Sequence, residues 1–167
     1  LKNNDSKLIL KSSVHDHQLV RDNIIGKFKK NGIDNDKIIF MERLKNYEDH
    51  LKAYNKIDIS LDTFPFAGAT TTFESLWMGV PTLTLDGKIF NSRFGISINK
   101  NLNLNEFIAK DKSDYVKKAK IISSDLNRLI KILEESNIDE LEVSTFWGKQ
   151  KIRLRKNSKD RKNIIDN

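Results

Sequence analysis

Residues 61–81 read LDTFPFAGATTTFESLWMGVP, which joins the end of an apolar strand, a bend containing Gly68, and an amphipathic helix. The helix is expected from Thr70 to Met78, with Gly79 ending it. The first turn of a helix has backbone amides without a partner inside the helix, and the aligned peptide dipoles place about half a positive charge there. The order of these pieces therefore predicts an anion site, and a phosphate suits it.

The bend itself supplies the residue types that such a site needs. Gly68 and Ala69 let the backbone come close to a ligand. Thr70, Thr71 and Thr72 are expected to cap the helix and to offer hydroxyl donors.

Glu74 is expected one turn into the helix, near the same opening. A carboxylate beside a phosphate would repel it, so its better use is to accept hydrogen bonds from sugar hydroxyls, as in dinucleotide-binding folds. Phosphate and ribose together indicate a nucleotide. The alternative is an ordinary capped core helix whose buried stripe is Phe73, Leu76 and Trp77, and the residue pattern alone leaves both open.

Strand and helix patterns alternate along the first half of the chain. Strands are expected at Lys7–Leu10, Lys37–Met41, Ile57–Leu61 and Pro81–Leu85, and helices at residues 16–30, Tyr47–Tyr54 and Thr70–Met78. This order predicts a doubly wound α/β lobe, a parallel sheet with helices on both faces. Ligands in such sheets bind outside the carboxyl ends of the strands, where the bend at Gly68 falls.

The second half is expected to be mainly helical. Helices are expected near Asn91–Ile98, at Lys112–Ser123 and at Asp125–Ser136, with a polar stretch at Asn99–Asn105. The side chains expected to pack inward are Leu19, Val20, Ile24, Ile25 and Phe28 in the helix at 16–30, and Tyr115, Val116, Ala119 and Ile122 in the helix at Lys112–Ser123.

Several blocks keep the spacing of a known family. They are Leu61-Asp62-Thr63, Gly68-Ala69-Thr70-Thr71, residues 74–82, Ser92-Arg93-Phe94-Gly95, and Phe107-Ile108-Ala109-Lys110 followed by Asp114-Tyr115. In these blocks the chain resembles the C-terminal lobe of the O-GlcNAc transferase and SPINDLY family, glycosyltransferase family 41, over roughly residues 6–135. The resemblance implies a Rossmann-like C-terminal lobe of a GT-B glycosyltransferase. It also implies metal-independent transfer of a sugar from a nucleotide-sugar to Ser or Thr hydroxyls of proteins, with no cofactor. GlcNAc is the leading choice of sugar.

The resemblance adds two residues to the expected site. His50 lies twelve residues before Asp62, and the family keeps a histidine at that distance, so its ring is implied to pack by the nucleotide base. Arg93 could add positive charge beside the phosphate, or be a surface helix residue. Asp62 ends a strand and is expected to fix the following turn through hydrogen bonds.

Three positions differ from the O-GlcNAc transferase pattern. Ala69 stands where its turn has histidine, Tyr47 where it has lysine, and Glu74 where it has the ribose-binding aspartate. Plant SPINDLY proteins and many bacterial relatives are similar to this chain instead. The donor therefore stays open among UDP-GlcNAc, GDP-fucose and UDP-glucose.

At 167 residues the chain suits one lobe and begins with Leu1, so a fragment of a longer enzyme is expected. A second, N-terminal lobe, with helical repeats beyond it, would supply the acceptor site, any catalytic base and a phosphate-contacting lysine; Lys11 is not that lysine by position. No catalytic residue is identified within the chain. A non-catalytic nucleotide-binding α/β module is the alternative.

Charge is concentrated at the C-terminal end. The chain carries +7, of which residues 148–167, with eight basic and two acidic side chains, hold +6. A nearly neutral lobe at residues 1–147 followed by a basic tail does not favour nucleic-acid binding as the main function. In the tail the family commonly has an amphipathic helix. The density of Lys and Arg here argues against a packed helix, although Ile152 and Leu154 are compatible with one.

The sequence contains no membrane-length apolar stretch, no signal segment and no cysteine, so the expected location is the cytoplasm. Two patterns resemble metal sites. Asp34-Asn35-Asp36 reads better as a turn, and in His15-Asp16-His17 the aspartate is expected to cap a helix. No metal is expected.

Overall fold

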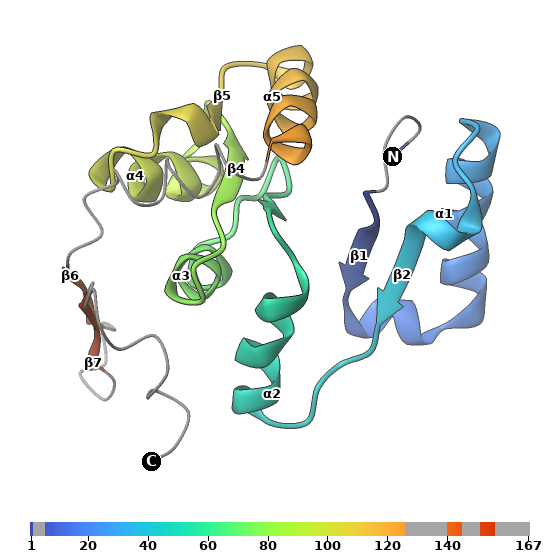
Figure 1. The fold of residues 1–167 in the computed structure, drawn as a ribbon, viewed down its shortest axis with the longest axis horizontal. Coiled ribbons are helices and arrows are strands. Elements are labelled where there is room, and N and C mark those ends of the chain that lie inside the picture. Colours follow the sequence, from blue (N-terminus) through green and yellow to red (C-terminus); the bar gives the residue numbers. More distant parts are fainter. Residues whose placement is uncertain (2–5, 126–139, 145–150, 156–167) are drawn as a thin grey trace. The chain divides into compact units, whose positions relative to one another are not determined.

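The computed structural model describes Leu1 and residues 6–125, 140–144 and 151–155, and it forms two compact units, Leu1–Asp58 and Ile59–Asn167 (Figure 1). Each unit contains parallel strands joined through helices. The predicted α/β class with parallel pairing is confirmed. The expected boundary between a lobe and a tail at residue 147 stays a prediction.

The first unit is a strand, helix, strand arrangement. Strand β1 (Leu8–Lys11) pairs in parallel with β2 (Ile38–Met41), and α1 (Gln18–Lys30) connects them. Short 3₁₀ turns at Ser13–Asp16 and Asn35–Lys37 lead into and out of this connection. Helix α2 (Tyr47–Lys52) continues into a 3₁₀ turn at Ala53–Lys56.

Two expectations for α1 are wrong. Asp16 does not cap it, because the chain makes a 3₁₀ turn first and His17 becomes the N-cap, without a side-chain bond. Leu19 is 84% exposed, whereas the other four apolar residues are half-buried. At about 100° per residue, the stripe through Val20, Ile24 and Phe28 leaves Leu19 on the opposite side of the helix.

The second unit holds three strands in the order β3 (Ser60–Leu61), β4 (Thr82–Leu85) and β5 (Ile108–Ala109), all parallel. Its helices are α3 (Thr70–Trp77), α4 (Phe94–Asn101) and α5 (Lys112–Ser124), with 3₁₀ turns at Phe90–Ser92 and Asn105–Phe107. All three helices contact β4, and α4 and α5 lie on opposite sides of it (Figure 1).

One core lies within the second unit. Its buried residues are Leu76, Leu83, Ile98, Leu102, Leu104, Phe107, Ala109, Tyr115 and Ile122. The stretch Asn99–Asn105, expected to be polar, contributes Leu102 and Leu104 to this core. Asn99 is fully buried and donates from its side chain to the Thr82 carbonyl (2.9 Å). That bond ties α4 to β4. Val116, expected inside, is 53% exposed.

The ends of α3 follow from its residues. Met78 is the C-cap, and Gly79 has φ +76°, which glycine adopts at little cost. The amide of Gly79 donates to Leu76 (2.9 Å) and that of Val80 to Ser75 (2.8 Å), so the two bonds form a Schellman motif. The predicted stop at Gly79 is confirmed.

Strands β6 (Glu140–Ser144) and β7 (Lys151–Arg155) form an antiparallel pair with Glu140 opposite Arg155. The segment with Ile152 and Leu154 is a strand and not the helix that the family commonly has, which agrees with the expectation from its density of Lys and Arg. Most of the helix expected at Asp125–Ser136 lies outside the described residues. Within the described parts of the chain, no helix has the length and apolar character needed to span a bilayer.

Candidate functional site

The amino end of α3 is the centre of the expected site. Ala69 is its N-cap and makes no side-chain cap bond, while the three threonines occupy the first three helical positions. The expectation that they cap the helix is wrong, because a capping side chain must stand just before the first turn rather than inside it. Thr70 and Thr71 are exposed, so this end is reachable from solvent.

Thr72 has a different environment from its two neighbours. It is 2% exposed, and its hydroxyl donates to the carbonyl of Gly68 (3.0 Å). Its hydroxyl proton is therefore directed at the bend. Of the three consecutive threonines, Thr70 and Thr71 are the two that solvent reaches.

Asp62 anchors the bend. Its side chain is 8% exposed, and its Oδ1 accepts from the amide of Gly68 (2.7 Å) while its Oδ2 accepts from the hydroxyl of Thr84 (2.7 Å). Burial raises the pKa of Asp62, and the hydrogen bonds from Gly68 and Thr84 oppose that shift. The expectation that Asp62 fixes the turn after its strand is confirmed.

Tyr115 of α5 completes this anchor. Its hydroxyl donates to the backbone carbonyl of Asp62 (2.8 Å). Burial, assisted by the negative charge of Asp62, raises the pKa of Tyr115. The bend is thus fixed to β4 through Thr84 and to α5 through Tyr115.

Two glycines leave room for this network. A Cβ on Gly68 would lie 2.5 Å from Oγ1 of Thr71, and a Cβ on Gly95 would lie 2.5 Å from Oγ1 of Thr84 and 2.8 Å from Oδ2 of Asp62. Gly95 is the second residue of α4, whose N-cap is Arg93. Its missing side chain lets α4 approach the buried carboxylate.

Glu74 and Arg93 differ in exposure. Glu74 lies one turn beyond Thr70 and is 8% exposed, so most of its side chain is covered. Arg93 is exposed at the junction between the 3₁₀ turn and α4. The loop before it is tied to the bend, because the amide of Ala67 donates to the carbonyl of Asn91 (3.0 Å).

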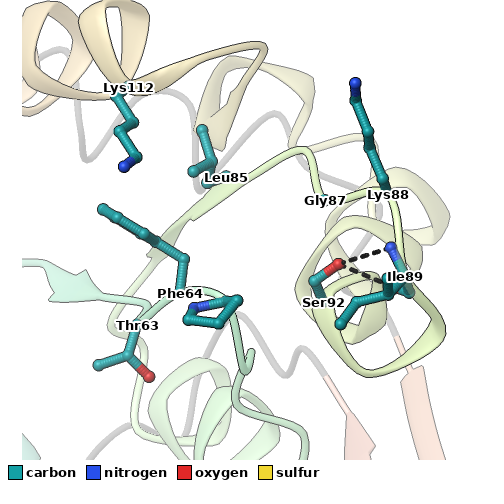
Figure 2. Close-up of a pocket in the computed structure, with 9 residues that line it drawn as sticks. Thr63, Phe64, Leu85, Gly87, Lys88, Ile89, Ser92 and Lys112 are labelled. Carbon is teal, nitrogen blue, oxygen red and sulfur yellow. Dashed lines mark hydrogen bonds between the residues drawn. The ribbon is translucent and has the colours of Figure 1, made fainter.

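A cavity of about 470 Å³ lies beside the bend and was not expected from the sequence. Figure 2 shows its lining, which is Thr63, Phe64, Pro65, Leu85, Gly87, Lys88, Ile89, Ser92 and Lys112. Segments after β3 and after β4 both contribute, which agrees with the rule that ligands bind at the carboxyl ends of parallel strands. Its sequence signal was the pair of apolar residues, Phe64 and Ile89, in loops that follow strands.

His50 belongs to the first unit and is half-buried. Its ring stacks on that of Tyr47 (centroids 6.0 Å apart, 24° between planes) and meets the ring of Tyr54 edge-on (5.7 Å, 87°). The ammonium of Lys11 contacts Nδ1 of His50. Because an ammonium only donates, Nδ1 must accept, and the ring proton belongs on Nε2.

The two metal-like patterns serve other purposes. The turn expected at Asp34-Asn35-Asp36 is confirmed, since a 3₁₀ turn runs from Asn35 to Lys37 with Asp34 as its N-cap residue. His15 packs edge-on against Phe40 with ring centroids 5.5 Å apart. Within the described ranges, no group of three or more His, Cys, Asp or Glu side chains could hold a metal ion.

Comparisons with known proteins show which family this chain is similar to. The family profile described as Glycosyl transferase family 41 matches residues 17–152. A probable UDP-N-acetylglucosamine–peptide N-acetylglucosaminyltransferase SPINDLY of Eustoma exaltatum subsp. russellianum is 36% identical over 125 residues, and its Arabidopsis thaliana counterpart is 33% identical over 128 residues. These matches cover 75% and 77% of this chain and 14% of each relative.

A solved structure of a mutant O-GlcNAc transferase from Thermobaculum terrenum is similar to this chain, with a TM-score of 0.72 and 28% identity. The match covers 77% of this chain and 24% of that one. The chain thus spans a small part of each of these relatives, with a GT-B-type α/β architecture. By the extent of the profile match and by these relatives, the chain belongs to glycosyltransferase family 41.

Proposed function

We propose that this chain is the donor-binding lobe of a glycosyltransferase that moves a sugar from a nucleotide-sugar to Ser or Thr hydroxyls of proteins. GlcNAc is the leading choice of sugar. The observation that carries the proposal is the solvent-accessible amino end of α3, where Thr70 and Thr71 are exposed beside a bend fixed by Asp62. An anion bound there would meet helix amides, the helix dipole and two hydroxyls.

The proposed role of this helix end in sugar transfer follows from the place where negative charge develops during the reaction. Breaking the bond between sugar and diphosphate leaves negative charge on the departing phosphate oxygens, and fixed donors at those oxygens lower the barrier. Rigidity matters, because donors that are already in place need no reorganisation during the reaction. The bonds that Asp62 makes to Gly68 and Thr84 give the bend that rigidity.

The other predicted residues take roles around this centre. Glu74 would accept hydrogen bonds from ribose, Arg93 would add charge beside the phosphates, and the backbone at Gly68 and Ala69 would let the ligand come close. His50 would pack by the base and donate from Nε2. No metal and no cofactor enters this scheme.

The acceptor hydroxyl and a catalytic base would come from a second, N-terminal lobe, with helical repeats beyond it. SPINDLY and O-GlcNAc transferase relatives are several times longer than the matched segment, which supports such a partner. Location in the cytoplasm belongs to the same proposal.

Nucleotide titration tests the donor site. We expect UDP or GDP to bind and to shift the backbone amide signals of Gly68 and Thr71 in NMR spectra. Thr71→Val keeps the shape but removes a hydroxyl that would bond to a charged oxygen, so binding should weaken roughly tenfold. Ser113→Ala removes an exposed hydroxyl from the first turn of α5 and should leave the affinity unchanged.

Absence of nucleotide binding up to millimolar concentration would overturn the donor-site assignment. A non-catalytic nucleotide-binding module is the second candidate, and a longer protein that includes the upstream lobe separates the two. Transfer from UDP-GlcNAc, GDP-fucose or UDP-glucose to protein would establish the enzyme and its donor. Nucleotide binding without any transfer would favour the module.

A further inference from the structure

The cavity beside the bend has few groups that could hydrogen-bond a sugar. The hydroxyl of Thr63 donates to the carbonyl of Phe66 (2.9 Å). The hydroxyl of Ser92 donates to the carbonyl of Ile89 (2.7 Å) and accepts from its amide (3.2 Å), as the dashed lines in Figure 2 show. Both hydroxyl protons are therefore already used, and a sugar would find few partners there.

Its charges have one sign. The lining includes two lysines and no carboxylate. The ammonium of Lys112 lies 5.5 Å from the ring centroid of Phe64 and points into the opening, whereas Lys88 stands at the opposite rim and points away from the other labelled side chains (Figure 2). A ligand that fits would place an apolar group inside and negative charge at the rim.

The surroundings of the cavity are unusually apolar for exposed loops. Phe64 is 44% exposed, Phe66 65%, Ile89 59% and Phe90 77%. The two loops that carry them are tied by the hydrogen bond from Ala67 to Asn91, so these side chains belong to one surface. Exposed apolar groups that cluster beside a cavity mark an interaction site. Phe66 and Phe90 are not part of the lining, so a ligand that contacts all four side chains must extend beyond the cavity.

We propose that this cavity docks a polypeptide segment that carries an aromatic or branched aliphatic side chain flanked by carboxylates. The apolar side chain enters between Phe64 and Ile89, and the carboxylates lie against Lys88 and Lys112. The proposal does not depend on sugar transfer, because none of its residues belongs to the nucleotide site at Gly68–Glu74.

The probe is a short synthetic peptide in which Phe alternates with Glu, titrated into the full chain and followed by backbone amide NMR. We expect signals of Phe64, Gly87 and Ile89 to shift, while those of Thr70 and Thr71 stay in place. Two comparison peptides carry Lys in place of Glu, or Ser in place of Phe. Both should bind at least tenfold more weakly, because each lacks one half of the complementarity.

Variants of the chain test the same contacts from the other side. Lys88→Glu with Lys112→Glu should weaken binding of the Phe-Glu peptide about tenfold or more, since attraction becomes repulsion at both rims. Lys120→Glu alters charge on the exposed face of α5, away from the cavity, and should have little effect. Ile89→Ser should weaken binding, and Ile121→Ser, at a 41% exposed position outside the lining, should not.

Several results would overturn the proposal. Equal binding of the Phe-Glu and Phe-Lys peptides would remove the charge argument, and no shift at Phe64 or Ile89 would remove the site. Shifts there on adding UDP-GlcNAc would assign the cavity to the donor, and self-association abolished by Ile89→Ser would assign it to a second copy. Nucleotide shifts at Thr70 and Thr71 report on the proposed function separately, so the two failures are distinguishable.

Discussion

Replacing Asp62 with alanine should destabilise the chain strongly, although the residue lies at a strand end. The change leaves two donors without their acceptor, the amide of Gly68 and the hydroxyl of Thr84, each bonded at 2.7 Å in the structure. A buried donor left unsatisfied costs about 1–3 kcal/mol. Thr84 is fully buried and Gly68 half-buried, so we expect a total of about 2–4 kcal/mol.

Thermal and urea unfolding measure this loss. At about 2–4 °C per kcal/mol for a chain of this size, the midpoint should fall by about 5–15 °C. Asp86→Ala is the matched control, because Asp86 is an exposed aspartate in the same unit and its loss should cost less than about 0.5 kcal/mol. Hydrogen exchange should also become faster at the Gly68 amide in the Asp62 variant.

The same site gives a pH dependence with a defined sign. Burial raises the pKa of Asp62 above its ordinary value of 3.8, so the folded chain holds this proton more tightly than the unfolded chain. The contribution of this group to stability is therefore complete below pH 3.8 and is lost as pH rises through the folded pKa. Relative to Asp62→Asn, which has no such titration, the wild type should lose stability over that window.

Two results would refute the reasoning. One is a loss for Asp62→Ala no larger than that for Asp86→Ala, which would mean that water satisfies both donors. The other is a difference between wild type and Asp62→Asn that grows in favour of the wild type as pH rises. That sign would mean that hydrogen bonding to the carboxylate outweighs its burial.

The remaining predictions concern the same network. Gly95→Ala should cost about 1–3 kcal/mol of stability through overpacking against Thr84, and it should shift the Gly68 amide signal. Gly79 has φ +76° and no atom within 4 Å of the position that a Cβ would take, so Gly79→Ala should destabilise the chain through backbone strain and leave the Gly68 signal unchanged. Tyr115→Phe should cost about 0.5–1.5 kcal/mol at neutral pH. Because the pKa of Tyr115 is raised, its contribution is complete below pH 10.0 and lost above it, so urea midpoints should show an alkaline decline in the wild type that is smaller in Tyr115→Phe.

Local sequence patterns predicted most elements and the stop of α3, since strand periodicity, helix spacing and a glycine at a helix end act over a few residues. They also predicted that Asp62 fixes its turn. They missed β5, because Ile108–Ala109 pairs for only two residues and gains its place from β4. They placed Leu19 inside because it adjoins Val20 in the sequence, although helical spacing turns these two side chains about 100° apart.

The candidate site divides in the same way between local and distant causes. The glycine and threonine bend was visible in the sequence because adjacent residues form it. The bonds that tie Asp62 to distant elements were not, since Thr84 and Tyr115 lie 22 and 53 residues from Asp62. The cavity beside it escaped notice for this reason, as its lining comes from loops after two strands and from the start of α5.

The two units differ in how far a buried core supports the residues assigned to the proposed donor site. In the described residues of Leu1–Asp58, Ile38 is the one buried apolar residue, whereas the unit that carries the bend at Gly68 has a contiguous core. A rigid support suits phosphate, whose charge must meet donors already in place. His50 is held instead by neighbouring rings and Lys11. On the donor-site proposal, substitutions near His50 should therefore alter the preference between UDP and GDP in titrations, at less cost in stability than substitutions near Gly68 would cause.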